Sequence, residues 1–175
     1  MEYTKQIKKW DVFEYVCHGL EDGNPFVDHW IKGRFVHTKE AVEIDGFYDG
    51  NGTYRVRFMP SFEGVYSFFI EGSGSIQSYK GEFLVVPPEE GNHGPVRVAN
   101  TYHFAYEDGT PYYSIGTTCY VWELQTDELI EKTLNNLRNA HFNKIRFCIW
   151  PKHYDFNLGE PRSYPYEGRP MDSQV

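Results

Sequence analysis

Two short segments of the chain combine hydroxyl, aromatic and charged side chains in a pattern that favours binding of a sugar. The first is PYYSIGTTCYVWE, residues 111–123, an apolar run that ends in threonines and large aromatics. The second is NKIRFCIWPKHYD, residues 143–155, which carries an arginine and ends in aromatic, basic and acidic residues. Aromatic faces can stack on the C–H faces of a pyranose, while charged side chains hydrogen-bond its hydroxyls. The candidate binding residues are Thr117, Thr118, Tyr120, Trp122, Arg146, Trp150 and His153.

The chain between these two segments is predicted to form a helix that places their ends together. Thr126 is suited to cap the first turn, and Asp127 and Glu128 suit the positive end of the helix dipole. The positions that recur at helical spacing are Ile130, Leu134, Leu137 and His141. The order strand, helix, strand predicts a βαβ unit, whose parallel strands present their carboxyl ends at one edge of a sheet. Upstream, a strand near residues 96–106 and a turn at 107–110 are expected to form a hairpin with a strand that begins at Tyr112.

Each candidate residue also has an ordinary structural explanation, and the sequence leaves both open. Trp122 and Trp150 could simply pack loops, and Thr117 and Thr118 could serve a turn or a helix cap. Arg146 lies inside an otherwise apolar strand, where a charge is costly unless a carboxylate pairs with it. That pair would be a structural ion pair or, in a glycosidase, would keep a catalytic nucleophile ionised.

Residues 1–88 have the alternating pattern of an all-β domain. Phe13, Tyr15 and Cys17 fall on one face of one predicted strand, and a second strand places Tyr54, Val56 and Phe58 inward. A third run is expected to place Val27, His29, Ile31 and Phe35 on one face. Asn51-Gly52 predicts a tight hairpin, since both residue types tolerate positive φ. Seven or so short strands in this length favour an immunoglobulin-like antiparallel β-sandwich, followed by a linker at 89–95.

The composition disfavours several classes of partner. The formal net charge is −8 and no dense basic cluster exists, so nucleic acid and anionic membrane surfaces are not expected as partners. No run of about 20 apolar residues is present, as a membrane-spanning helix would need. The first ten residues, MEYTKQIKKW, lack the apolar region of a signal peptide, which favours a cytoplasmic location and leaves secretion of a longer parent open.

Motifs for metals and cofactors are also lacking in the sequence. The seven histidines and three cysteines form no set with metal-ligand spacing, and the cysteines are expected to be buried reduced thiols. The run IGTTCYVWE has one glycine and does not form a phosphate-binding loop. No G-x-S-x-G motif indicates a serine hydrolase. We therefore expect no metal and no cofactor.

The chain resembles the N-terminal part of a family of glycoside hydrolases that pair an immunoglobulin-like β-sandwich with an apiosidase-like (β/α)8 (TIM) barrel. The resemblance covers roughly residues 10–152, and its best markers are Asn92–Pro95 and Gly116–Thr118. The stretches that carry it are NPFVDHWIKGRF, IDGFYDGNGTYRVRFMPSFEGVYSF, GEFLVVPPEEGNHGPVRVANTYHFAYEDGTPYYSIGTTCYVW and LRNAHFNKIRFCIWP. The chain departs from the family at His141, where a glycine would commonly close the helix.

The resemblance implies that residues 111–118 are barrel strand 1, residues 127–140 the first outer helix and residues 143–150 strand 2. Barrels of this kind form their active site at the carboxyl ends of the strands. The wider group of retaining glycosidases uses an acid/base after strand 4 and a nucleophile at strand 7. A whole barrel needs about 250 residues, so residues 96–175 supply only an incomplete βαβ fragment. This chain is therefore expected to contain no catalytic carboxylate pair and to be inactive alone.

Three functions agree with these observations. The chain is a fragment of a glycoside hydrolase acting on an oligo- or polysaccharide, or a non-catalytic carbohydrate-binding module, or a β-sandwich that only supports a barrel. For the second function the candidate surface aromatics are Trp30, Tyr48, Tyr66 and Tyr79, which core packing would also explain. The sequence specifies neither the sugar nor the stereochemistry of the reaction, and it leaves homo-oligomer formation open.

Overall fold

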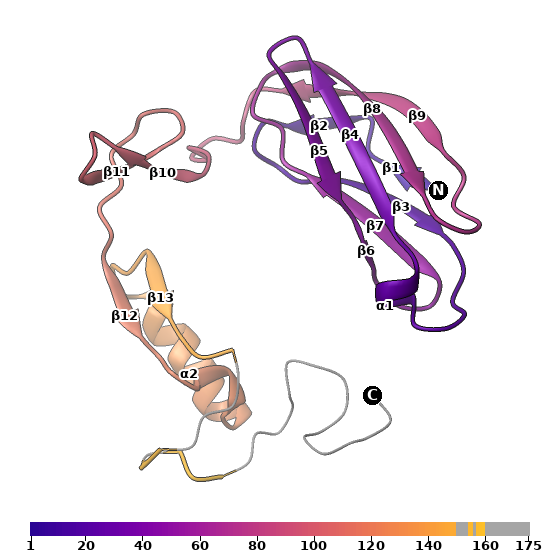
Figure 1. The fold of residues 1–175 in the computed structure, drawn as a ribbon. Helices are drawn as coiled ribbons and strands as arrows, with labels where there is room; N and C mark the ends of the chain where they lie inside the picture. The colour runs from indigo at the N-terminus through magenta and orange to yellow at the C-terminus, as the bar shows by residue number, and fades with distance from the viewer. Residues whose placement is uncertain (150–153, 156, 160–175) are drawn as a thin grey trace. The chain divides into compact units, whose positions relative to one another are not determined.

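The first half of the chain folds into two facing β-sheets in a computed structural model of the protein. The structure describes residues 1–149, 154, 155 and 157–159. One sheet has the strand order β1-β3-β7-β6 and the other β2-β9-β8-β4-β5 (Figure 1). The four-stranded sheet comprises β1 (Glu2–Tyr3), β3 (Phe13–His18), β6 (Phe47–Tyr48) and β7 (Thr53–Phe58). The five-stranded sheet comprises β2 (Gln6–Lys8), β4 (Ile31–His37), β5 (Glu40–Asp45), β8 (Gly64–Gly72) and β9 (Tyr79–Val86).

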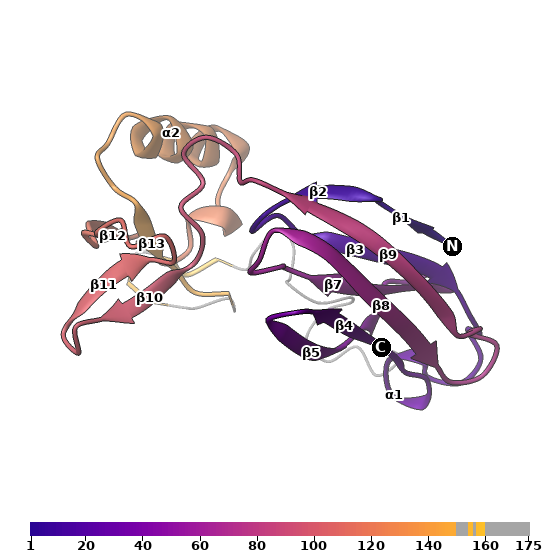
Figure 2. The ribbon, with the colours of Figure 1, turned by 90° about the horizontal axis from the view of Figure 1, so that it is seen from above.

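The mainly β fold expected from the sequence is confirmed, and the two facing sheets contain one parallel pair of strands. Strands β2 and β9 run parallel, whereas the other neighbours in both sheets run antiparallel. Figure 2 shows the two layers from above. The hairpin at Asn51-Gly52 is also confirmed, because both residues have positive φ, at 49° and 66°.

Aromatic rings from both sheets fill the space between the layers. Phe13 of β3 stacks on Phe83 of β9 with ring centroids 4.2 Å apart, and Phe35 of β4 stacks on Phe58 of β7 at 4.3 Å. Both stacks join one sheet to the other, and the rings belong to a single cluster of buried residues. The predicted inward positions of β3 and β7 are confirmed: Phe13, Tyr15, Cys17, Tyr54, Val56 and Phe58 are buried.

One predicted inward residue, Val27, is instead exposed on the short helix α1 (Pro25–Asp28). Asn24 caps this turn, since its side-chain oxygen accepts a hydrogen bond from the Phe26 backbone N–H at 3.2 Å. Pro25 at the first helical position favours the same conformation. The chain is therefore helical where the sequence pattern predicted an extended strand, and the strand itself begins at Ile31.

Most of the aromatics proposed for a sugar-binding face of the sandwich belong to the core. Tyr66 is fully buried, and its hydroxyl donates to Glu40 Oε1. Burial, together with that hydrogen bond, raises the pKa of Tyr66 well above its ordinary value. Tyr48 and Tyr79 are partly buried and pack against the core cluster, which leaves Trp30 as the exposed member of the set. The packing explanation is therefore right for Tyr48, Tyr66 and Tyr79.

Between residues 96 and 111 the structure differs from the expected hairpin. The single strand predicted for 96–106 is two antiparallel strands, β10 (Val96–Ala99) and β11 (His103–Tyr106). The chain reverses between them because Asn100 and Thr101 adopt positive φ, at 49° and 69°. The turn at 107–110 is present, since the Gly109 N–H donates to the Tyr106 carbonyl at 2.9 Å. An isolated bridge at Pro111 follows it in place of a strand from Tyr112.

The remaining elements form the predicted βαβ unit. They are β12 (Gly116–Thr118), the 3-10 helix η1 (Trp122–Leu124), α2 (Asp127–Arg138) and β13 (Lys144–Arg146), with β12 and β13 parallel. Thr126 caps α2 as expected, because its Oγ1 accepts from the Leu129 N–H at 3.4 Å. Both strands are shorter than the residue ranges 111–118 and 143–150, and the helix ends at Arg138.

The chain divides into two compact units, Met1–Pro111 and Tyr112–Val175. This division assigns β10 and β11 to the first unit, whereas the sequence placed residues 96–175 together. The predicted boundaries, 1–88, 89–95 and 96–175, stay a prediction. Cys17 is buried and Cys119 and Cys148 are half-buried, and all three are free thiols. In the part of the chain that the structure describes, no helix has the length and apolar character needed to cross a membrane.

The outer face of the four-stranded sheet carries a cluster of charges centred on Glu14. Glu14 Oε1 accepts from Arg55 Nη1 and Glu14 Oε2 from Arg57 Nε, both at 2.6 Å. Arg55 also donates to Asp49 at 2.5 Å. The hydrogen bond from Arg57, followed by that from Arg55, holds the pKa of Glu14 below its usual value of 4.5.

We expect Phe35→Ala to lower the free energy of unfolding by about 3–5 kcal/mol, because it removes a fully buried ring and leaves a cavity between the sheets. The matched control is Phe26→Ala, whose ring is 67% exposed and which we expect to change stability little. Urea denaturation of the whole chain, followed by circular dichroism, measures both. Equal losses in the two variants would show that Phe35 is not a core contact.

We also expect the Glu14 cluster to make stability depend on acid pH. A lowered pKa in the folded state means that its contribution is present above the ordinary pKa and is lost as the pH falls through the folded value. From pH 5 to pH 3 the wild type should therefore lose more stability than Glu14→Gln, measured by urea midpoints. Glu71→Gln is the control, because Glu71 makes no ion pair among the described residues. A loss in Glu14→Gln equal to that of the wild type would contradict this assignment.

Candidate functional site

The parallel pair β12 and β13 brings predicted site residues to one edge of the second unit. Thr117 lies opposite Ile145 and Thr118 opposite Arg146. The pairing continues past both strands, because the Cys119 N–H donates to the Arg146 carbonyl and the Cys148 N–H donates to the Tyr120 carbonyl, both at 2.9 Å. Since the strands run parallel, both segments leave the sheet at the same edge.

Arg146 links two of the other predicted site residues. It lies opposite Thr118 in the strand pair and contacts Tyr120. Arg146 Nη2 donates to the Tyr120 hydroxyl at 3.2 Å, and its guanidinium carbon lies 5.6 Å from the centre of the Tyr120 ring. The guanidinium therefore makes both a hydrogen bond and a cation–π contact with one side chain. Thr117 and Thr118 belong to strand β12, while the helix cap is Thr126, so neither threonine has the capping role that was left open.

Arg146 does not have the environment that the sequence predicted. An apolar strand suggested a buried charge with a carboxylate partner, but Arg146 is exposed. No ion pair to Arg146 occurs among the residues that the structure describes. Solvent covers this face of the short strand, so the charge is hydrated and needs no buried partner.

Trp122 and Glu123 in η1 carry the buried polar atoms of this edge that have no hydrogen-bond partner among the described residues. The Trp122 ring lies 6.3 Å from Phe147 in an edge-to-face arrangement, which agrees with the packing role that was left open. The Trp122 Nε1 atom and both carboxylate oxygens of Glu123 are buried and have no hydrogen-bond partner in the part of the chain that the structure describes. Buried polar atoms in folded proteins nearly always have partners. Glu123 is not among the site residues predicted from the sequence, although its place directly after the aromatic residues at the end of a predicted strand was a usable signal.

The segment beyond β13 returns to the same edge in the residues that are described. Tyr154 lies edge-to-face with Tyr120 at 6.3 Å, and Gln125 Nε2 donates to Asn157 Oδ1 at 3.1 Å. Trp150 and His153, the other two predicted site residues, lie outside the described residues. The assignment of the whole set to sugar binding stays a prediction.

Asn143 positions the chain that enters β12, in a segment where a strand was predicted. Its Oδ1 accepts from the Ile115 N–H at 3.0 Å, and its Nδ2 donates to the Tyr113 carbonyl at 2.8 Å. The Asn143 backbone N–H also donates to the Ile115 carbonyl at 2.9 Å. One side chain thus takes the place of a neighbouring strand for residues 113–115, which explains why β12 begins only at Gly116.

The side chains at this edge are suited to binding a sugar ring rather than to cleaving a glycosidic bond. Threonine hydroxyls, a phenol, an indole and a guanidinium provide hydrogen bonds and ring faces. Cleavage of a glycosidic bond commonly takes two carboxyl groups on either side of the bond. In the described residues no group of three or more His, Cys, Asp or Glu side chains is arranged to hold a metal ion.

Comparison with known proteins finds a domain family and a solved structure that are similar to this chain. The model of a domain of unknown function, DUF5060, matches residues 6–73. No curated protein is similar enough to match the chain. The crystal structure of a "putative glycoside hydrolase" from Bacteroides vulgatus ATCC 8482 is similar, with a TM-score of 0.87 and 41% sequence identity. The match covers 94% of this chain and 32% of that one, so the chain spans about a third of the length of this relative.

We expect Asn143→Ala to expose the segment before β12 to proteolysis. Losing the two side-chain hydrogen bonds to Tyr113 and Ile115 should speed chymotrypsin cleavage after Tyr113 by about fivefold to a hundredfold, since each bond contributes about 0.5–1.5 kcal/mol. Mass spectrometry of timed digests gives the rate at this bond. Asn136→Ala, on the exposed side of α2, is the control and should cleave at the wild-type rate. An unchanged rate in Asn143→Ala would show that the side chain does not hold this segment.

Proposed function

We propose that this chain is the N-terminal part of a glycoside hydrolase that acts on an oligo- or polysaccharide, and that it is inactive alone. The observation that carries the proposal is the 41% identity, over 94% of the chain, to the "putative glycoside hydrolase" from Bacteroides vulgatus. Because the match spans only 32% of that protein, the catalytic activity would belong to the longer chain. Glycoside hydrolysis by two carboxylates would then use residues supplied by later barrel strands.

In this proposal residues 1–88 form an immunoglobulin-like sandwich that supports the enzyme, 89–95 are a linker and 96–175 begin a (β/α)8 barrel. The parallel pairing of β12 and β13, with α2 between them in the chain, supports the assignment, since a barrel is built from such βαβ units. A single unit covers one face of its strands at most, and parallel strands are normally covered on both faces. The second unit should therefore need further chain to complete its fold.

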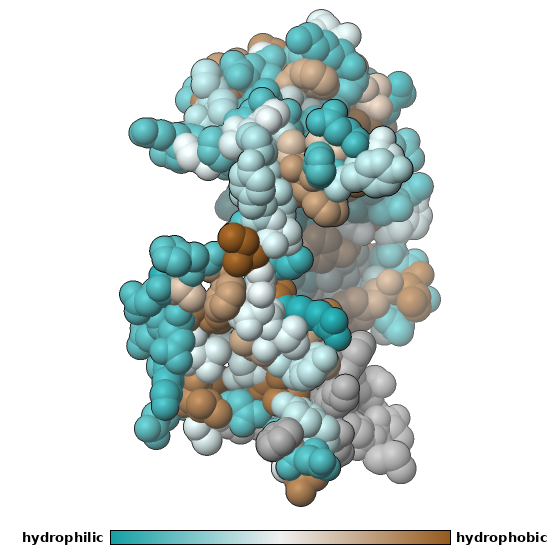
Figure 3. Space-filling view, turned by 90° about the vertical axis from the view of Figure 1, so that its left-hand side faces the viewer, coloured by the Kyte–Doolittle hydropathy of each residue, from teal (hydrophilic) through white to brown (hydrophobic). Residues whose placement is uncertain are grey.

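The exposure of apolar side chains in the second unit supports its incompleteness. Ile115, Phe147 and Ile149 are 52%, 43% and 63% exposed, although all three lie beside or just after the strands. Val121 is the buried hydrophobic residue of the described part of this unit. Figure 3 shows hydrophobic residues reaching the surface among hydrophilic ones. Later barrel strands and helices would cover these residues in the longer protein.

The residues at the edge of β12 and β13 would then form the first part of the rim of the active site. Thr117 and Thr118 would offer hydroxyls, and Tyr120 and Trp122 would offer ring faces, with Trp150 farther along. Arg146 and His153 would hydrogen-bond sugar hydroxyls. The buried carboxylate of Glu123 and the indole N–H of Trp122 would take their partners from the later chain.

A chimera tests the proposal. In the Bacteroides vulgatus protein, residues 1–175 replace the segment to which they are similar, and the product is assayed on a panel of aryl glycosides and plant polysaccharides. We expect the chimera to hydrolyse the same substrates as the intact Bacteroides protein, with kcat/KM within about tenfold. Residues 1–175 alone should hydrolyse none of them.

Arg146 gives an internal test within the same chimera. Arg146→Ala should lower kcat/KM by about tenfold to a hundredfold if the guanidinium contacts the substrate, whereas Arg138→Ala, a matched substitution on α2, should not. Hydrolysis by residues 1–175 alone, or an intact relative that is inactive on the whole panel, would overturn the proposal. Equal effects of the two arginine substitutions would remove Arg146 from the site.

A further inference from the structure

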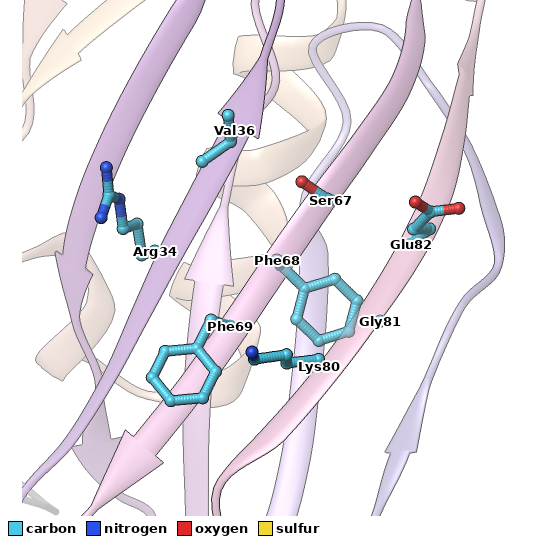
Figure 4. Close-up of a pocket in the computed structure, with 8 residues that line it drawn as sticks. All are labelled: Arg34, Val36, Ser67, Phe68, Phe69, Lys80, Gly81 and Glu82. Carbon is cyan, nitrogen blue, oxygen red and sulfur yellow. The ribbon is translucent and has the colours of Figure 1, made fainter.

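The outer face of the five-stranded sheet carries a pocket that the proposed catalytic role does not use. It has a volume of about 630 Å³ and lies over β4, β8 and β9. Figure 4 shows the residues that line it. The side chains that matter for the argument are Arg34, Val36, Ser67, Phe69, Lys80 and Glu82. Its size falls within the range of about 300–1,000 Å³ that is usual for small-ligand sites.

Strand register places these six side chains in two rows across the sheet. Arg34 lies opposite Phe69, and Phe69 lies opposite Lys80, which forms the first row. Val36 lies opposite Ser67, and Ser67 lies opposite Glu82, which forms the second row. Alternation along each strand sends all six outward. Phe35 lies between Arg34 and Val36, Phe68 lies between Ser67 and Phe69, and Phe83 follows Glu82, and all three point into the core.

The first row holds an aromatic ring between two cations, and Glu43 of β5 lies opposite Arg34 at the end of the row. Lys80 Nζ lies 5.5 Å from the centre of the Phe69 ring, and Figure 4 shows its amine pointing toward that ring. Among the described residues neither Arg34 nor Lys80 makes an ion pair. The neighbouring Lys32, by contrast, lies 3.9 Å from Glu43 and 3.7 Å from Asp45.

The charge of the pocket is opposite to that of the whole chain. Its lining has two cations and one carboxylate, which gives a net charge of +1, while the chain has a formal net charge of −8. Lys80 beside the Phe69 ring and Arg34 opposite Phe69 in the register make no ion pair among the described residues, and together they favour an anionic ligand. Phe69 offers a ring face for stacking, while Ser67 and Glu82 in the second row can hydrogen-bond hydroxyl groups.

We propose that this pocket binds a uronic acid residue of a glycan chain. The pyranose would stack on Phe69, its carboxylate would pair with Arg34 and Lys80, and its hydroxyls would contact Ser67 and Glu82. The choice of a sugar rests on the proposed function, whereas the preference for an anion rests on the two unpaired cations. The site lies in the first unit, so it would hold the polysaccharide at a place separate in sequence from the β12–β13 edge.

The test is binding of tri-galacturonic acid to residues 1–175 by isothermal titration calorimetry, with the carboxyl-reduced trisaccharide as the matched ligand. We expect the acid to bind at least tenfold more tightly than the reduced form. The double substitution Arg34→Ala/Lys80→Ala should weaken binding of the acid at least tenfold. Phe69→Leu, which keeps an apolar side chain but removes the ring face, should weaken binding of both trisaccharides.

Lys39→Ala is the control protein, because Lys39 makes a similar contact with Phe62, at 5.2 Å, outside the pocket. It should bind as the wild type does. Thermal melting of each variant verifies that it is folded. If Phe69→Leu does not fold, the double substitution Arg34→Ala/Lys80→Ala still tests whether the pocket binds the acid. No binding, equal binding of both trisaccharides, or an equal loss in Lys39→Ala would overturn the proposal.

Two further ligands distinguish a sugar site from a surface that binds anions in general. Dextran sulfate or an acidic peptide binding as tightly as tri-galacturonic acid would also overturn the proposal, since either result means that the surface attracts any anion. Failure of this binding test does not affect the hydrolysis expected of the chimera, because that experiment uses other ligands and other residues. Failure of the chimera with intact uronate binding would leave a glycan-binding domain without the proposed enzyme.

Discussion

Ring-on-ring packing of Phe13 against Phe83, and of Phe35 against Phe58, joins the two sheets of the first unit. The rest of that unit depends on these contacts, because side chains alternate across each strand. A slip of one residue in register would exchange the inner and outer faces. The core thereby also determines the outer face, where Arg34, Phe69 and Lys80 align across three strands. The pocket and the aromatic core are two consequences of a single register.

The second unit is governed by the opposite condition, a lack of apolar partners. Its strands pair in parallel and its helix is capped, so local hydrogen bonding is well satisfied. Its described apolar side chains are half-buried or exposed except for Val121, and Trp122 and Glu123 bury polar atoms that have no hydrogen-bond partner among the described residues. Local propensity can thus form the elements of a βαβ unit, while its stability must come from tertiary packing. In the proposed longer protein, further chain would supply that packing.

Sequence patterns predicted the features that depend on neighbours along the chain. The inward faces of β3 and β7, the Asn51-Gly52 turn and the Thr126 cap all follow from residues a few positions apart. Val27 was misplaced because an Asn-Pro cap overrode the alternating pattern, and the 96–106 strand because Asn100 and Thr101 adopt positive φ without a glycine. Tyr66 and Tyr79 could not be separated from surface aromatics without knowing the second sheet. The Arg34–Phe69–Lys80 row was missed since it joins three strands distant in sequence.

Hydrogen exchange tests most directly the claim that a self-sufficient first unit precedes an incomplete second one. Mass spectrometry would compare amides in residues 1–175 alone with the same residues inside the chimera. The account predicts that β3, β4, β7, β8 and β9 are equally protected in both proteins. It also predicts that β12, α2 and β13 exchange quickly in the short chain and become protected in the chimera. Strong protection of β12, α2 and β13 already in residues 1–175, unchanged in the chimera, would contradict it.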